Sequence, residues 1–164
     1  MKFLVDRMLG KLAKQLRLLG YDAVYFRDAH ISYMIQQARQ ETRTIITRNT
    51  RLVPRGSEDL VIWLTEDSPR LQLQELIAKG IVSFDEERVF SRCLICNDIL
   101  DRLSRDHVEG KVADFVFCHH QEFFQCPNCR RIYWKGSHQE RMKKTVQSLF
   151  SPSWPREPSL DADH

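Results

Sequence analysis

The chain has 164 residues, of which 42% are hydrophobic and 29% are charged, and its formal net charge is +3. This length suffices for one domain of about 90 residues with a hydrophobic core, plus a smaller module. No apolar run approaches the roughly 20 residues needed to span a bilayer, which excludes a membrane protein, and we expect a soluble, cytoplasmic one.

Short apolar runs alternate with amphipathic segments over the first part of the chain. The predicted strands and helices, in chain order, are 3–5, 8–19, 23–26, 32–40, 44–47, 60–64 and 70–79. Gly20 and Gly80 are expected to end the first and third helices, Ser32 to cap the second, and Ser68-Pro69 to begin the third. Because strands alternate with helices, the sequence predicts an α/β fold with right-handed crossovers, a parallel sheet and three layers.

Two CxxC motifs follow a predicted boundary near residues 86–91. They are Cys93-Leu-Ile-Cys96 and Cys126-Pro-Asn-Cys129, and the 29 residues between them can span a small β-hairpin. Two such pairs complete a tetrahedral zinc site, so we predict a structural zinc ribbon with sulfur at all four positions. Disulfides and a redox pair remain as alternatives, although disulfides need an oxidising compartment and the N-terminus does not resemble a signal peptide.

The other residues of the C-terminal part are expected to form a ribbon loop, a basic helix and a disordered tail. Cys118 lies in an apolar run and is expected to be buried, and His119 and His120 are expected in a ribbon loop outside the metal site. A basic amphipathic stretch covers 139–150, and the three prolines that follow indicate a disordered tail. The expected organisation is a first domain, a zinc ribbon and a basic helical extension with its tail, at residues 1–90, 91–142 and 143–164.

Polar side chains follow each predicted strand: Asp6, Asp28, Asn49 and Asp67. The carboxyl ends of parallel strands are where α/β folds build their sites. Convergent carboxylates there hold Mg²⁺ or Mn²⁺ for phosphodiester hydrolysis. Asp28 and Asp67 occur in turn contexts where Asp often bonds the backbone, so a structural role remains open for each.

Basic residues concentrate at the N-terminal end. Residues 1–55 hold eleven Lys/Arg and four acids, whereas residues 56–90 hold three Lys/Arg and eight acids. This asymmetry suits a polyanionic partner, and solvated helix faces explain it equally well. The cations expected near the acidic edge, where they would bind backbone phosphates, are Arg7, Lys11, Arg48 and Arg51.

Several of these segments together resemble one family. The opening FLVDRMLGKLA, the later ITRN, and the two CxxC motifs, the second followed by YWKGSH, resemble the Mut-seven C-terminal RNase family over about residues 2 to 142. The resemblance implies a PIN-like nuclease domain followed by a zinc ribbon, with RNA as substrate and several acids around Mg²⁺ or Mn²⁺. Asp6 matches the family's first acid, and Asp28 is the nearest candidate for the second.

Asn49 departs from the family pattern, which usually has Thr-Arg-Asp where this chain reads Thr-Arg-Asn. Some other PIN-type nucleases carry Asn there, but they supply an Asp three residues later, where this chain has Leu52. An amide oxygen adds no charge, and charge dominates the binding of hard cations. One hypothesis is an Mg²⁺- or Mn²⁺-dependent ribonuclease that uses Asp6 and Asp28, with Asp67 as a further candidate acid and Asn49 as a neutral ligand. The other is a non-cleaving RNA-binding module.

The zinc ribbon would contribute to the second function. Its aromatic and basic residues could stack on bases, although Tyr and Trp in a small ribbon are as often core residues. These residues are Tyr133, Trp134 and His138, with Arg131 and Lys135. A third hypothesis is an adaptor that contacts a protein or ribonucleoprotein through the ribbon.

Overall fold

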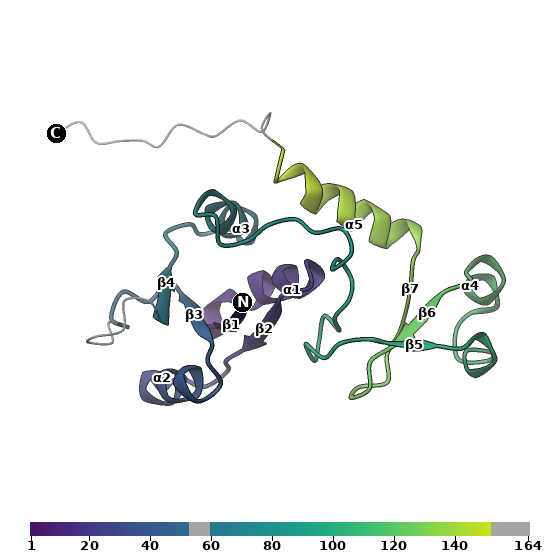
Figure 1. Ribbon diagram of the computed structural model, residues 1–164, viewed down its shortest axis with the longest axis horizontal. Coiled ribbons are helices and arrows are strands. Elements are labelled where there is room, and N and C mark those ends of the chain that lie inside the picture. Colours follow the sequence, from purple (N-terminus) through teal and green to yellow (C-terminus); the bar gives the residue numbers. More distant parts are fainter. Residues whose placement is uncertain (53–59, 152–164) are drawn as a thin grey trace.

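A four-stranded parallel sheet forms the centre of the N-terminal region (Figure 1). The computed structural model describes residues 1–52 and 60–151, apart from the side chain of His138. The strand order is β2-β1-β3-β4, and the strands are β1 (Lys2–Val5), β2 (Asp22–Tyr25), β3 (Thr44–Thr47) and β4 (Val61–Trp63). The predicted α/β fold with a parallel sheet is confirmed.

Helices cover both faces of this sheet: α1 (Gly10–Leu18) and α3 (Pro69–Ala78) lie on one face and α2 (Ile31–Gln40) on the other. Successive side chains of a strand point to opposite faces. Accordingly, Phe3 and Val5 join the core beneath α1 and α3, whereas Leu4 joins the core beneath α2. The α/β region therefore has three layers.

Local signals explain most of the helix ends. Gly20 and Gly80 follow α1 and α3 with φ values of 82° and 69°, a conformation that favours glycine. A Cβ on Gly20 would also lie 2.3 Å from the carbonyl oxygen of Arg88. The Ser68 hydroxyl accepts a hydrogen bond from the Leu71 N–H at 3.3 Å and caps α3, as predicted.

The predicted cap of α2 is wrong. His30 occupies the N-cap position, without a side-chain capping bond, and Ser32 lies within the first turn of the helix. The preceding loop sets this start, because Asp28 Oδ1 accepts a hydrogen bond from the His30 N–H at 2.9 Å. That contact forms an Asx turn just before α2.

A three-stranded antiparallel sheet, in the order β5-β6-β7, forms the C-terminal region. Its elements, with the short helices between β5 and β6, are β5 (Asp101–Leu103), η3 (Arg105–His107), α4 (Asp114–His119), β6 (Phe123–Gln125) and β7 (Ile132–Trp134). The predicted burial of Cys118 is wrong, because Cys118 is exposed on α4. Phe115 on the same helix is 69% exposed, so α4 buries little of its apolar run.

The last described helix, α5 (Ser137–Ser148), returns from the ribbon to the first domain (Figure 1). Val146 and Leu149 belong to the same core cluster as the leucines of α1 and α3. The Phe84 and Phe150 rings lie 5.7 Å apart, and Lys143 pairs with Glu86. α5 therefore packs on the core cluster that α1 and α3 share with the parallel sheet.

Two further expectations concern the ends of the chain and the membrane. The tail predicted to be disordered covers residues 151–164, and all of it except Ser151 lies outside the described residues. Within the described part of the chain, no helix has the length and apolar character needed to cross a bilayer.

Candidate functional site

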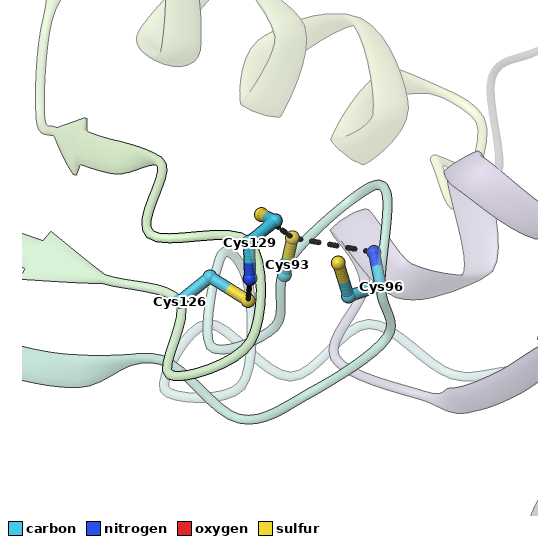
Figure 2. A group of neighbouring side chains, drawn as sticks. All are labelled: Cys93, Cys96, Cys126 and Cys129. Atoms are coloured by element: carbon cyan, nitrogen blue, oxygen red, sulfur yellow. Dashed lines mark hydrogen bonds between the residues drawn. The ribbon is translucent and has the colours of Figure 1, made fainter.

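Four cysteine sulfurs gather between the two CxxC turns (Figure 2). All four sulfurs, from Cys93, Cys96, Cys126 and Cys129, lie within 4.8 Å of one another. The Cys93 and Cys129 sulfurs are 3.7 Å apart, well beyond the roughly 2.05 Å of a disulfide. A tetrahedral zinc with Zn–S bonds of about 2.3 Å places its ligand sulfurs about 3.8 Å apart. The four thiols thus fit a metal such as zinc.

The two CxxC turns repeat one backbone geometry. In each turn, the N–H of the second cysteine points at the sulfur of the first, at 3.3 Å and 3.5 Å. The residue after each turn has a positive φ, 73° at Asn97 and 61° at Arg130. Its N–H donates to the carbonyl of the first cysteine, at 2.9 Å and 3.0 Å. This repeated turn directs both sulfurs of each pair to one point.

The thiols differ strongly in their tendency to ionise. Burial alone would raise the pKa of Cys93, but hydrogen bonds from the Tyr133 hydroxyl and nearby backbone N–H groups outweigh it and lower the pKa to about 6. Burial, a hydrogen bond to Cys129 and the negative charge of Cys93 raise the pKa of Cys96 to about 12. Four adjacent thiolates repel one another, and a bound divalent cation would remove this obstacle.

Tyr133 has a role that the sequence did not indicate. Its hydroxyl lies 3.1 Å from the Cys93 sulfur. Burial raises the pKa of Tyr133 most, and the hydrogen bond to Cys93 raises it further. A donor that contacts a ligand atom stabilises the thiolate and fixes its position. The side chain therefore supports the cysteine cluster, whereas base stacking was one of the roles expected for it.

The first CxxC turn docks on the edge strand β2. Asn97 is 8% exposed, and its Oδ1 accepts the Ala23 N–H at 2.9 Å. Its Nδ2 donates to the Asp22 carboxylate at 2.7 Å. From the other side, the buried Arg17 guanidinium of α1 donates to the carbonyls of Leu94 and Ile95 at 2.9 Å and 2.8 Å. The sequence carries no signal for these contacts, because the partners are more than 70 residues apart.

Asp6 lies at the carboxyl end of the central strand β1 and is 6% exposed. Its Oδ2 accepts a hydrogen bond from the Thr47 hydroxyl at 2.5 Å. The same hydroxyl oxygen accepts the Asn49 N–H at 2.9 Å, so Thr47 links the ends of β1 and β3. Asn49 Oδ1 in turn accepts the Arg51 N–H at 3.0 Å, which closes an Asx turn. Sequence reasoning did not assign a site role to Thr47.

The other two acids that follow strands have polar partners of their own. Asp28 is exposed, and hydrogen bonds from the backbone and the ring of His30 lower its pKa. Asp67 is 87% exposed and forms an ion pair with Arg48. Leu52, three residues after Asn49, is fully buried beneath α2. That position therefore belongs to the core.

Within residues 1–52 and 60–151, the four cysteines are the one group of at least three His, Cys, Asp or Glu side chains close enough to share a metal. His119 and His120 do not belong to it, and the His119 ring contacts the Phe115 carbonyl at 2.8 Å. Among the cations predicted to bind phosphate, Arg7, Lys11 and Arg51 are exposed. Arg48 Nε is buried and has no hydrogen-bond partner among the described residues.

Comparison with known proteins bears on this arrangement. The family model described as the Mut7-C RNAse domain matches residues 1–146, which include the sheet, its acidic edge and all four clustered cysteines. No curated protein and no solved structure matches the chain. The matched family suggests a nuclease-like role and RNA as the substrate. Because the match covers most of its length, the chain belongs to the Mut7-C RNAse domain family.

Proposed function

We propose that the chain is a ribonuclease that hydrolyses RNA phosphodiester bonds with Mg²⁺ or Mn²⁺ held at the acidic edge of the parallel sheet. In this proposal, residues 1–90 form a PIN-like nuclease domain, residues 91–142 a zinc ribbon, and residues 143–164 a basic extension. Family membership supports the nuclease role. The fit of the four cysteines to a metal supports the structural zinc.

The environment of Asp6 is the observation that carries the proposal. The side chain is 6% exposed, yet no Lys, Arg or His nitrogen in the described part of the chain lies within ion-pair distance of it. Burying a carboxylate without a cation is costly. A hard metal ion bound at this edge would compensate the charge, and carboxylate oxygen is the ligand type that such ions prefer.

Asp6 would be the central metal ligand, with Asn49 and Asp28 as further oxygen donors. When bound, the ion would supply positive charge for the scissile phosphate and lower the pKa of a water. Thr47 holds the Asp6 carboxylate in position through its 2.5 Å hydrogen bond. Arg7, Lys11, Arg48 and Arg51 would hold the flanking phosphates.

A non-cleaving RNA-binding protein is the second candidate, and the donor set favours it. Among the described residues, Asp6 belongs to no group of three or more carboxylates, imidazoles or thiols close enough to share a metal. Asn49 contributes no charge. In this alternative, the same basic edge and the ribbon hold RNA, or a ribonucleoprotein, without hydrolysis.

Cleavage of labelled single-stranded and structured RNA with Mn²⁺ or Mg²⁺ separates the two candidates. The variants are Asp6→Asn and Asn49→Asp, with Asp101→Asn on the exposed start of β5 as the matched acid-to-amide control. Cleavage that survives Asp101→Asn and is lost in Asp6→Asn supports the nuclease. Cleavage gained only in Asn49→Asp indicates an inactivated nuclease site. RNA binding without cleavage by any variant supports the second candidate.

A further inference from the structure

A groove of about 660 Å³ separates α1 from the first CxxC turn. One wall is α1 with the residues just before it, and the other is formed by the end of β2 and residues 94–97. Asp67 and Pro69 at the start of α3, and Met8 and Leu9 before α1, also line the groove. The Leu9 N–H donates to the Asp6 carbonyl at 2.8 Å, so this end of the groove adjoins the acidic edge.

Exposed cations line the groove. Lys11 and Lys14 project from α1, and Arg27 follows β2. None of the three has a carboxylate within 4.0 Å among the described residues. The one acid in the lining, Asp67, is already paired with Arg48. The groove therefore carries an uncompensated positive charge.

This arrangement lowers the stability of the isolated helix. Lys11 and Lys14 lie three residues apart on one face of α1, where like charges repel. The first turn of α1 contains no acidic residue, and Lys11 opposes the helix dipole there. A polyanionic ligand in the groove would remove both penalties, because its charge complements all three cations.

Apolar groups on the groove wall provide a surface for bases. The Tyr25 hydroxyl donates to the Arg7 carbonyl at 2.6 Å, which fixes the orientation of the ring. A Cβ on Gly10 would lie 3.3 Å from this ring, so the ring packs closely on the start of α1. The Arg27 guanidinium lies 5.8 Å from the ring centroid. Across the groove, Ile95 of the CxxC turn is 45% exposed.

We propose that this groove binds a segment of single-stranded RNA that leads from the acidic edge to the first CxxC turn. Lys14 and Arg27 contact phosphates, and bases lie against Tyr25 and Ile95. The volume is that of a pocket for one small ligand, which suits a few nucleotides of one strand and not a double helix. This inference rests on the proposed function, and it gives the ribbon a direct part in substrate binding.

Binding of a short fluorescent oligouridylate, measured by anisotropy over a range of salt concentrations, tests the groove. The Asp6→Asn background prevents cleavage, and the zinc-loaded full chain is used. The double variant Lys14→Gln/Arg27→Gln is compared with Lys2→Gln, an exposed cation at the opposite end of β1. We expect binding about 10-fold weaker in the double variant and a salt slope lower by about 1.4, since each phosphate contact on a single strand contributes about 0.7.

Lys2→Gln should leave both the affinity and the salt slope unchanged. Equal RNA affinities for the double variant and the Asp6→Asn protein would contradict RNA binding in the groove. The proposed function stands in that case if the unaltered protein still cleaves RNA. Absence of RNA binding and cleavage in the unaltered protein overturns both. Cross-linking of 4-thiouridine RNA gives a second readout: cross-links to residues 94–95 support the path, and cross-links confined to other surfaces contradict it.

Discussion

Replacement of Asn97 by glycine tests whether the first CxxC turn holds the edge of the parallel sheet. Glycine adopts the φ of 73° found at this position without strain, so the substitution removes the side chain and preserves the turn. Both hydrogen bonds from the side chain to β2, with Ala23 and Asp22, are lost. The stability of the α/β domain should fall although the change lies in the ribbon.

The magnitude follows from the partners that remain. Ala23 is 0% exposed, and an orphaned buried N–H costs about 1–3 kcal/mol. The charge-assisted bond to Asp22 adds about 1 kcal/mol, because Arg43 still binds that carboxylate at 2.6 Å. Relief of the left-handed φ offsets the greater freedom of glycine in the unfolded chain, as it also does at Arg130, so this effect adds nothing to the difference. We therefore expect the free energy of unfolding to fall by about 2–4 kcal/mol.

Arg130→Gly is the matched control, because Arg130 occupies the same position of the second turn with a φ of 61°. Its exposed side chain makes no hydrogen bond or ion pair among the described residues, so we expect a change within about 0.5 kcal/mol. Urea unfolding followed by far-ultraviolet circular dichroism, with zinc content measured for each variant, supplies the comparison. Equal losses in the two glycine variants would refute the docking role of Asn97.

Three further outcomes are expected. Burial opposes ionisation of Glu75, but hydrogen bonds from Lys79 and two backbone N–H groups outweigh it and lower the pKa of the carboxyl group. Its contribution to stability is therefore present above about pH 4.3 and is lost as the pH falls through the lower pKa of the folded state. In urea unfolding, Glu75→Gln should be less stable than the unaltered protein at pH 7, and its free energy of unfolding should fall less steeply as the pH is lowered. Thr47→Val removes the bond to Asp6 and should lower unfolding free energy by about 1–3 kcal/mol and reduce RNA cleavage, whereas an unchanged cleavage rate would argue against a positioning role. Tyr133→Phe should weaken zinc binding about 10-fold in competition with a chromophoric chelator, and equal zinc affinities would contradict the supporting role of the hydroxyl.

Local rules made much of the fold predictable. Gly20 and Gly80 have the positive φ that ends a helix, and Ser68 caps α3, as their positions in the sequence indicate. The CxxC spacing likewise predicts sulfurs that converge, because two intervening residues form one tight turn. These features depend on backbone angles and hydrogen bonds within a few residues, so composition and spacing are sufficient to find them.

Predictions that depended on neighbours distant in the chain were less reliable. The apolar run of α4 suggested that Cys118 is buried, but no residue of α4 belongs to either core cluster of the parallel sheet, and Cys118 is exposed. The error at Ser32 has a local cause instead, because Asp28 contacts His30 two residues along the chain and this contact sets the start of α2. Burial and competing caps depend on which partner is present, and an apolar pattern does not specify the partner.

The sequence by itself determined the α/β alternation, the cysteine set and the residues at the strand ends, because strand polarity and short-range spacing bring them together. Only the tertiary structure decided that Thr47 joins Asp6 to Asn49 and that Asn97 fastens the first CxxC turn to β2. Thr47 and Asp6 are 41 positions apart in the sequence, and Asn97 and Ala23 are 74 positions apart. They exist because packing of the sheet and the ribbon leaves buried polar groups that only a distant side chain can satisfy.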